Sequence, residues 1–296
     1  MTLKDIHHDN MISDSKNDPW TQSQDGREKE KVGLSENVIS LEHNAFDDQY
    51  VGCEKTMEMK AKELLAQERA MNSNFDEAWV EAENIWKKKK SKNRMEMLFE
   101  IAVIAYTLEN PKIYSAFNEA VRKCCESREA YMNNFHFKAL HFYLTRAVQI
   151  MRRSCKNVYR GVSVKVHREG AKEMRFGQFA STSLKEDKAR SFAKTSGSSG
   201  TLFKVYTCEG ASIEDLSFYP DEREVLIPPY EVFSVSEPEK NGLKTFELRS
   251  TRTYSKFNCA YQEASANKVA VPEQLTTILF SGVLTLVLQA HSQILI

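Results

Sequence analysis

The sequence has no excess charge of either sign, because 41 lysine and arginine residues balance 41 aspartate and glutamate residues. With zero formal net charge, no global field favours nucleic acid or an anionic membrane surface as a partner. The cysteines lack C-x-x-C spacing and the histidines lack metal-ligand spacing, which argues against a zinc or thioredoxin-type site. We therefore expect no metal, and structural or surface roles for three central histidines: His136, His141 and His167.

The first 43 residues, Met1 to His43, contain no apolar run that could form the core of a signal peptide. Their polar and charged composition predicts a disordered segment. The scattered cysteines nevertheless favour widely spaced disulfides, which form in an oxidising compartment. There are six of them: Cys53, Cys124, Cys125, Cys155, Cys208 and Cys259.

The C-terminal end differs, because Leu275 to Leu288 is an uncharged apolar run of 14 residues, short for a bilayer-spanning helix of about 20. The small residues Ala264-Ser265-Ala266 and a polar spacer, Asn267 to Gln274, precede it. This layout matches a glycolipid (GPI) anchor signal, whose tail is removed. The alternatives are a buried C-terminal helix or a short membrane span. An anchored chain must enter the secretory pathway, so we interpret Met1 as an alternative start or a gene-model artefact.

Helical patterns occupy the first half of the chain. Glu54 to about Lys90 has no proline or glycine and is rich in good helix formers, which predicts two helices. The second carries Phe75, Trp79, Ala82 and Trp86 at helical spacing, typical of a buried stripe, and Lys87 to Lys90 is interpreted as its solvated end. An apolar segment, Ile101 to Tyr106, precedes Pro111, and further helices are predicted at Ile113 to Glu126 and His136 to Arg152. The last helix is expected to direct five residues inward: Phe137, Leu140, Leu144, Val148 and Ile150.

After Cys155 the pattern changes to short strands separated by turns, with a flexible connection at Ser196 to Gly200. Helices followed by strands predict an α+β fold in one catalytic-sized domain. The expected strands are Val158–Val166, Met174–Phe179, Thr201–Cys208, Val225–Ile227, Glu231–Val235 and Thr245–Arg249.

Two carboxylates stand immediately before one of these strands, in the stretch YPDEREVLIPPY from Tyr219 to Tyr230. In an extended backbone Glu222 and Glu224 would project to one side and Arg223 to the other. Pro228-Pro229 ends the strand, because proline cannot donate a ladder hydrogen bond. Taken alone, the charged residues are more typical of a solvated loop than of a site.

Two more strand-associated groups could carry chemistry. Arg160, followed by Gly161, could clamp a phosphate or carboxylate, because guanidinium matches both. Ser181, in the stretch Phe179 to Ser183, could bind a ligand or simply form a cross-strand contact. A serine esterase is not indicated, because no G-x-S-x-G elbow with a paired histidine is present.

The order of these motifs resembles the arginine-specific mono-ADP-ribosyltransferases of vertebrate cell surfaces, in the R-S-E class shared with cholera-toxin-like enzymes. The resemblance runs from Asn44 to about Tyr261. It rests on the motifs NAFDDQYVGC, AYT (105–107), HFKALHFYLTRAVQ, VYRG, RFGQFASTS, TLFKVYTCEGA, EVLIPPYEVF and FNC (257–259). It implies a helical region followed by a mixed, β-sandwich-like NAD-binding core of the ADP-ribosyltransferase type.

The resemblance also implies roles for individual residues. Arg160 would anchor NAD, Ser181 would orient the catalytic carboxylate, and Glu224 would bind the nicotinamide ribose and stabilise an oxocarbenium-like state. Glu222 would engage the acceptor guanidinium and help to remove its proton. Tyr106 and Gln178 would add NAD contacts. NAD is then a co-substrate, and no permanently bound cofactor is expected.

Disulfides joining Cys53 to Cys259 and Cys155 to Cys208 are implied in the same way, which leaves Cys124 and Cys125 free, paired with each other, or paired with another chain. The expected partners are NAD, acceptor proteins with an accessible arginine, and a membrane reached through the C-terminal lipid anchor, at the cell surface or outside the cell. No nucleic acid is expected.

The implied organisation is a disordered segment (1–43), a catalytic domain (44–262) and a spacer with a hydrophobic tail (263–296). Two other functions remain open from sequence: an NAD glycohydrolase, in which water is the acceptor, and a catalytically idle surface module that keeps the fold for interaction.

Overall fold

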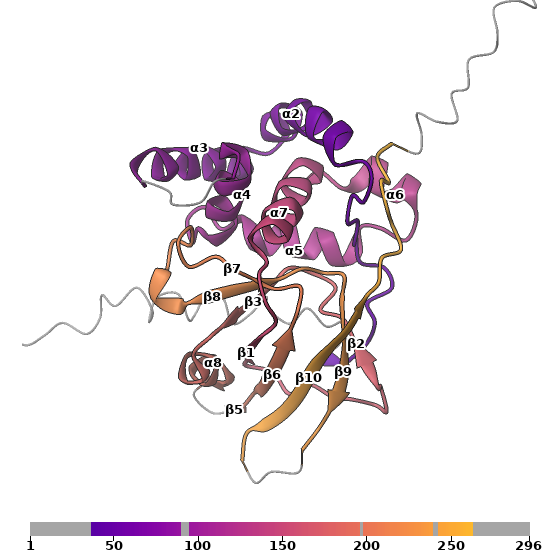
Figure 1. The fold of residues 1–296 in the computed structure, drawn as a ribbon, viewed down its shortest axis with the longest axis vertical. Coiled ribbons are helices and arrows are strands. Elements are labelled where there is room, and N and C mark those ends of the chain that lie inside the picture. The colour runs from indigo at the N-terminus through magenta and orange to yellow at the C-terminus, as the bar shows by residue number, and fades with distance from the viewer. Residues whose placement is uncertain (1–36, 90–94, 196–197, 239–241, 263–296) are drawn as a thin grey trace, which may run out of the picture. The chain divides into compact units, whose positions relative to one another are not determined.

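The computed structural model describes residues 37–89, 95–195, 198–238 and 242–262 (Figure 1). The predicted anchor signal, most of the predicted disordered segment, Lys90 and part of the predicted flexible connection lie outside the described residues. Residues up to Cys259 form one compact unit, and the unit that follows is described for only three residues. In the part of the chain that the structure describes, no helix has the length and apolarity needed to cross a bilayer.

Helices dominate the first half, as the pattern predicts. They are α2 (Glu54–Met71), α3 (Ser73–Lys88), α4 (Met97–Thr107), α5 (Ile113–Lys123), α6 (Arg128–Asn134) and α7 (Lys138–Met151). Asn72 caps α3 by accepting a 3.1 Å hydrogen bond from the amide of Phe75, and Ser127 caps α6 by accepting one from Ala130. The short α6 was not predicted, because its seven residues are too few to show a helical period.

The aromatic stripe of α3 is part of the core. Phe75, Trp79 and Ala82 are buried, and the half-buried Trp86 donates a 2.7 Å hydrogen bond from its indole to Glu100 of α4. Ile150 of α7 is 39 % exposed, so the prediction that it points inward was wrong. It lies two residues after the buried Val148, which turns it about 200° around the helix.

The strands form one eight-stranded sheet among the described residues, in the order β2-β9-β10-β6-β1-β3-β8-β7. Its members are β1 (Lys156–Val162), β2 (Glu173–Met174), β3 (Ala180–Ser183), β6 (Thr201–Thr207), β7 (Ala211–Ser212), β8 (Glu224–Ile227), β9 (Glu231–Ser236) and β10 (Lys244–Thr253). A short hairpin of β4 (Lys194–Thr195) and β5 (Ser198–Ser199) stands apart. Pairs are antiparallel except β6 with β10, which are parallel.

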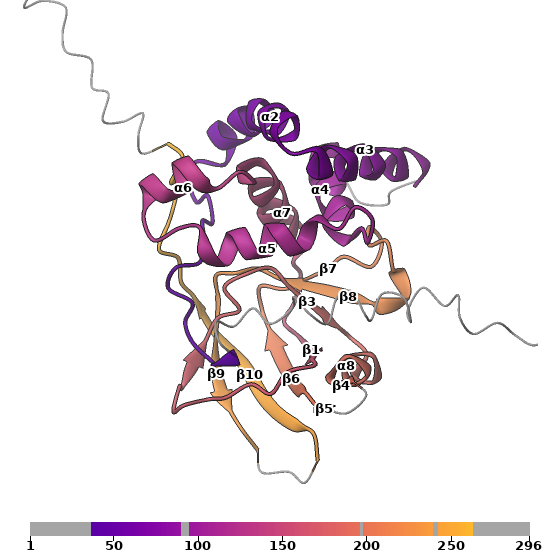
Figure 2. The ribbon, with the colours of Figure 1, turned by 180° about the vertical axis from the view of Figure 1, so that it is seen from behind.

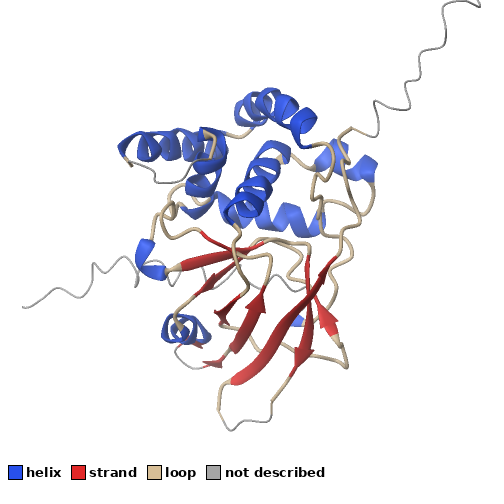
Figure 3. Cartoon of the chain, viewed as in Figure 1, coloured by secondary structure: helices blue, strands red, loops and turns tan. Residues whose placement is uncertain are grey.

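The sheet is divided into two parts, because the described register joins β1 to β3 at one position, Tyr159 opposite Ser183. Apolar side chains of both parts share one buried cluster, in which Val158 and Phe203 of one part meet Ala180 and Val225 of the other. Two sheet parts around one core agree with the sandwich-like arrangement that was expected. The helices α2 to α7 gather on one side of the strands, and α5 lies along the strand layer in both views (Figures 1, 2 and 3).

The segment predicted as a strand from Met174 to Phe179 pairs only at β2. Gly177 adopts a φ of +63°, and a Cβ at this position would lie 2.4 Å from the side chain of Glu42. This turn takes the chain out of the sheet after Met174. It also carries Gln178 toward the helices.

Helix α8 (Glu186–Ala193) was not predicted and packs against β1. The contact depends on Gly161, because a Cβ there would lie 1.7 Å from the carbonyl oxygen of Ala189. The glycine after Arg160 is thus explained by helix packing.

Residues before the predicted domain boundary at 44 also belong to the folded region. Val38 forms a bridge with His167, and Ile39 is buried in the sheet cluster. Further along, Asp47 forms a fully buried ion pair with Arg175, whose guanidinium also donates to the carbonyls of Leu41, Glu42 and Tyr254.

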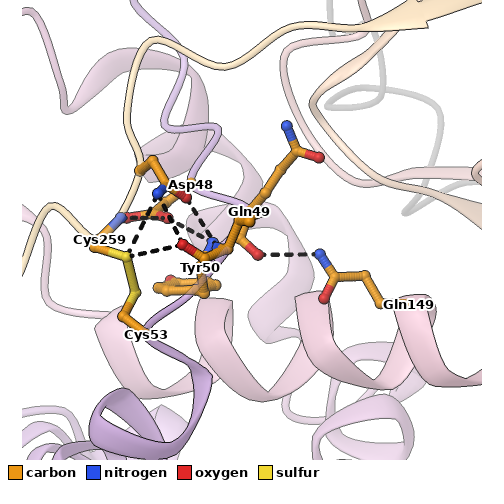
Figure 4. The surroundings of a disulfide bond; sticks show 8 residues. Asp48, Gln49, Tyr50, Cys53, Gln149 and Cys259 are labelled. Atoms are coloured by element: carbon orange, nitrogen blue, oxygen red, sulfur yellow. Dashed lines mark hydrogen bonds between the residues drawn. A yellow bond between two sulfur atoms is a disulfide. The ribbon is translucent and has the colours of Figure 1, made fainter.

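Disulfides join Cys53 to Cys259 and Cys155 to Cys208, the pairs that the resemblance implies, and a third joins Cys124 to Cys125. Around the first, Asp48 accepts hydrogen bonds from the amides of Tyr50 (2.7 Å) and Cys259 (3.0 Å), as Figure 4 shows. The side chain of Gln149 on α7 donates to the carbonyl of Gln49 in the same segment. The start and end of the folded chain are therefore held together here.

Candidate active site

Arg160 lies on the buried face of β1, between Val158 and Val162 on the same face. Its guanidinium donates a 2.8 Å hydrogen bond to the carbonyl of Ser181 and lies 5.8 Å from the ring of Phe176. Burial lowers the pKa of Arg160 to about 10, so the group stays positively charged at neutral pH. A cation is therefore held at a buried position in the site.

Strand pairing brings the serine motif next to the carboxylate. In the antiparallel pair of β3 and β8, Ser181 stands opposite Leu226 and Ser183 opposite Glu224. Opposed residues share one face, so Ser181 and Glu224 project to the same side of the sheet.

The carboxylate pair is not extended, and the predicted alternation over 222–224 was wrong. Pro220–Glu222 forms a 3-10 turn, and Arg223 adopts a left-handed conformation with φ 46° and ψ 51°. Glu224 is the first residue of β8. Both carboxylate residues are nonetheless buried, at 6 % exposed for Glu222 and 3 % for Glu224, so the solvated-loop interpretation does not hold for them. Arg223 is half exposed and lies 3.7 Å from Glu214.

A cleft lies between the helices and the sheet, and residues of both line it. It collects five of the predicted residues: Tyr106, Arg160, Gln178, Ser181 and Glu224. Glu222 is not among its lining residues. It lies two residues away from Glu224 on the loop that enters β8, and its carbonyl accepts a 2.7 Å hydrogen bond from Ser183.

Tyr106 anchors the helical wall of the cleft. Its hydroxyl donates to the carbonyl of Phe179 at 3.1 Å and accepts from the side chain of Asn118 at 3.0 Å. Burial raises the pKa of Tyr106 to about 12, and the negative charge of Glu224 acts in the same direction. The hydroxyl is therefore neutral at physiological pH. Gln178, on the opposite wall, accepts a hydrogen bond from Arg122 of α5.

Sequence reasoning missed several residues of the site. Asn118 is a polar residue within the buried stripe of α5, and such a residue is the kind of signal that could have been used. Ser217, which donates a 3.3 Å hydrogen bond to Glu224, carried no signal, because only the folded loop brings the two together. The other missed lining residues are Thr107, Tyr114, Ser115 and Phe179.

The arrangement places a buried guanidinium and a buried carboxylate in one cleft. The guanidinium of Arg160 can bind phosphate, and the carboxylate of Glu224 can stabilise an adjacent cation within a buried site. The described residues contain no group of three or more His, Cys, Asp or Glu side chains that could hold a metal ion.

The fold places the protein in a structural class. The solved structure of the mono-ADP-ribosyltransferase ART2.2 matches it with a TM-score of 0.67 and 40% identity, over 76% of this chain and 99% of that chain. ART2.2 has also been solved as variants in complex with NADH and with NAD. The protein therefore has the fold of an ADP-ribosyltransferase.

Sequence comparison gives the family. The profile of the family NAD:arginine ADP-ribosyltransferase matches residues 39–256. Ecto-ADP-ribosyltransferase 5 of Bos taurus is 42% identical over 245 residues, 77% of this chain and 76% of the relative. T-cell ecto-ADP-ribosyltransferase 2 of Rattus norvegicus is 41% identical over 240 residues, 79% of this chain and 84% of the relative. The chain belongs to the NAD:arginine ADP-ribosyltransferase family, whose enzymes use NAD as a co-substrate and arginine as the acceptor of ADP-ribose.

Proposed function

We propose that Glu224 is the catalytic carboxylate of this transferase, that Arg160 anchors NAD and that Ser181 helps to orient this carboxylate. The observation that carries the proposal is the burial of Glu224 in one cleft with Arg160 and Ser181. In the reaction, the bond between nicotinamide and the ribose carbon C1′ breaks, and its electron pair leaves with nicotinamide. The ionised Glu224 accepts a hydrogen bond from the ribose 2′-hydroxyl and stabilises the positive charge that develops at C1′.

The acceptor arginine then supplies the new bond. One guanidinium nitrogen bonds to C1′ of ADP-ribose and loses a proton, which Glu222 accepts. Glu222 lies outside the cleft lining and two residues before Glu224, which supports giving the two carboxylates different roles. Tyr106 and Gln178 contact NAD in this proposal, on the strength of their place in the cleft wall.

The test is the transfer of label from NAD to an arginine-rich acceptor protein. Glu224→Gln keeps the shape and removes the charge, so it should lower transfer about 100-fold or more, as expected for loss of a positioned electrostatic partner. Glu222→Ala should lower transfer to arginine. The hydrolysis of NAD, in which water is the acceptor and nicotinamide is released, should continue. Glu247→Gln, at an exposed position of β10, is the matched control and should transfer normally. Equal labelling by wild type and Glu224→Gln would contradict the assignment.

Nicotinamide release with and without the acceptor separates transfer from hydrolysis. A transferase should release nicotinamide faster when the arginine acceptor is present. A rate that ignores the acceptor would favour the glycohydrolase, and an absence of NAD binding by calorimetry would favour the idle interaction module.

We further propose that the catalytic domain, predicted at 44–262, begins before residue 44, because Val38 and Ile39 are part of the fold, and that it acts on proteins at the cell surface or outside the cell. The relatives named as ecto-enzymes and the disulfides, which suit an oxidising compartment, support this location. The sequence pattern of 263–296 supports attachment through a GPI anchor. Expression of the full gene in animal cells, followed by a phospholipase specific for GPI anchors, should release the enzyme into the medium. An enzyme that stays with the cells would contradict the anchor.

A further inference from the structure

The loop that presents Glu224 begins and ends at the same place in the sheet. Ser212 of β7 pairs with Val225 of β8, and the amide of Ile213 donates a 3.0 Å hydrogen bond to the carbonyl of Glu224. Residues 214–223 therefore leave the sheet beside Glu224 and return to it at Glu224. Whatever fixes this loop also fixes the carboxylate.

Within the loop, Ser217 contacts the carboxylate directly. Its hydroxyl donates a 3.3 Å hydrogen bond to Oε2 of Glu224 and accepts a 3.1 Å hydrogen bond from the amide of Tyr219. Both side chains are buried, with Ser217 1 % exposed and Glu224 3 %. A hydroxyl held in this way selects one orientation of the carboxylate group.

Lys89 holds Ser217 from a distant part of the chain. It follows the last residue of α3, and its ammonium donates to the carbonyls of Ser217 (2.9 Å), Leu216 (3.2 Å) and Asp215 (3.5 Å). An ammonium has three donors, so these three consecutive carbonyls use them all. The interpretation of this lysine run as a solvated helix end was therefore wrong for Lys89, although Lys87 and Lys88 are exposed.

Thr107, at the end of α4, holds the next residue of the same loop. Its hydroxyl accepts a 3.0 Å hydrogen bond from the amide of Phe218 and donates one to the carbonyl of Ile104. The ends of two helices thus fix residues 215–218 on the side of the loop that faces the helical layer. Ser183 and Leu184 fix Glu222 and Arg223 on the side that faces the sheet.

We propose that Lys89 and Ser217 are positioning residues for catalysis, and that Lys89 acts through the loop backbone and the Ser217 hydroxyl on the carboxylate of Glu224. The inference rests on the proposed role of Glu224. Ser217 occupies Oε2 and so directs the other oxygen, Oε1, toward the ribose hydroxyl of NAD. Lys89 holds the backbone of Ser217 in the position from which its hydroxyl reaches Glu224.

The test compares steady-state transfer by wild type, Lys89→Met, Lys89→Arg and Ser217→Ala, with Lys88→Met as the matched control. Lys89→Met keeps the aliphatic stem and removes the donors. We expect kcat to fall between about 10-fold and 100-fold, as for a catalytic group displaced by about 1 Å. NAD affinity measured by calorimetry should change less than about threefold, because Arg160 and the cleft-lining residues other than Glu224 are untouched. Lys89→Arg should recover most of the rate, because it restores a cation that donates to the carbonyls.

A double-mutant cycle tests whether Lys89 and Ser217 act through the same chain of hydrogen bonds. If Lys89 acts through Ser217, the double variant Lys89→Met with Ser217→Ala should be no slower than the slower single variant, whereas independent effects would multiply. A kcat of Lys89→Met equal to that of Lys88→Met, or a loss that appears only as weaker NAD binding, would overturn the proposal. Should Lys89→Met fail to fold, Ser217→Ala serves as the test. Its kcat should fall while its NAD affinity stays nearly unchanged, and an unchanged kcat would overturn the proposal.

Failure of this inference is distinguishable from failure of the proposed function. Glu224→Gln is measured in the same series. If it transfers normally, the role of Glu224 is wrong. If it is inactive while the Lys89 and Ser217 variants transfer normally, only the positioning role is wrong.

Discussion

The hydroxyl of Ser183 donates a 2.7 Å hydrogen bond to the backbone carbonyl of Glu222. The next amide, that of Leu184, donates to the carbonyl of Arg223 at 3.2 Å, so the end of β3 holds the turn that precedes Glu224. Arg223 has a positive φ of 46°, a conformation that most residues with a side chain avoid. These contacts give the second serine of the Ser-Thr-Ser motif a role in holding the loop, while Ser181 lines the cleft.

Replacing Ser183 with alanine should therefore reduce activity as well as stability. The change removes the hydrogen bond to Glu222 and the one accepted from the amide of Lys185, each worth about 1 kcal/mol of unfolding free energy, and a displaced turn before Glu224 can lower kcat by about 10-fold or more. Ser234→Ala on β9 removes a similar hydrogen bond, to the carbonyl of Arg249, far from the loop and should leave kcat unchanged. Equal kcat for the two variants would contradict the role of Ser183.

Arg160→Lys should weaken NAD binding even though it keeps the positive charge. Lysine cannot hydrogen-bond the Ser181 carbonyl and clamp a phosphate with the same planar group. We expect NAD affinity, measured by calorimetry, to fall about 10-fold or more, the size of one charged hydrogen bond. Arg190→Lys, at a half-exposed position of α8, is the control. Unchanged affinity of Arg160→Lys would remove Arg160 from the NAD site.

Asp47→Ala should strongly destabilise the fold, because it leaves Arg175 buried without its carboxylate. Asp47 also accepts hydrogen bonds from the amides of Lys256 and Phe257. The change therefore removes contacts that join the segment of Asp47 to those of Arg175 and Lys256. We expect a loss of about 3–5 kcal/mol in urea unfolding. Glu173→Ala breaks the half-exposed pair with Arg252 and should cost about 1 kcal/mol or less. A comparable cost for both would contradict the central place of the buried pair.

The buried Glu68 should make stability fall as pH rises toward neutrality. Its carboxylate accepts hydrogen bonds from the amides of Lys138 and Ala139, yet burial raises its pKa to about 7. The unfolded chain releases this proton near pH 4.3. Between these values the folded state binds more protons than the unfolded state, so the unfolding free energy decreases with pH.

The measurement is urea unfolding at pH 5 and pH 7.5. Glu68→Gln cannot ionise, so its stability should fall less over this range than that of wild type. Glu63→Gln changes an exposed residue of the same helix and should behave like wild type. A wild-type slope retained in Glu68→Gln would show that other groups cause the dependence.

The local sequence pattern was enough to predict the helices and strands that lie in long, regular segments. The absence of proline and glycine from 54 to 90, with aromatic residues at helical spacing, predicted α2 and α3, because the helical period is strong over many turns. The strands β1, β6, β8, β9 and β10 overlap their predicted ranges, because β-branched and aromatic runs bounded by turns are equally local. Short elements such as α6, α8 and β7 gave no period to detect, and their formation depends on caps and packing.

The serine motif and the carboxylate pair could be found from sequence, but their geometry could not. An extended backbone predicted that Glu222 and Glu224 would project to one side. In the structure, a 3-10 turn and the left-handed conformation of Arg223 set their positions instead. Contacts with Ser183 and Leu184, about 40 residues earlier, hold that turn. The two-residue repeat of a strand describes only neighbouring residues, so it could not predict contacts with Ser183 and Leu184.

What the sequence by itself determined is the family and the α+β order of its elements, together with five residues that line the cleft: Tyr106, Arg160, Gln178, Ser181 and Glu224. Those are properties of short segments and of motif order. Only the tertiary structure decided that Lys89 reaches the loop of Ser217, that Asn118 joins Tyr106, and that Asp47 is buried against Arg175. In each of these contacts the two residues are brought together by tertiary packing. Packing depends on the whole fold and cannot be predicted from a local sequence period.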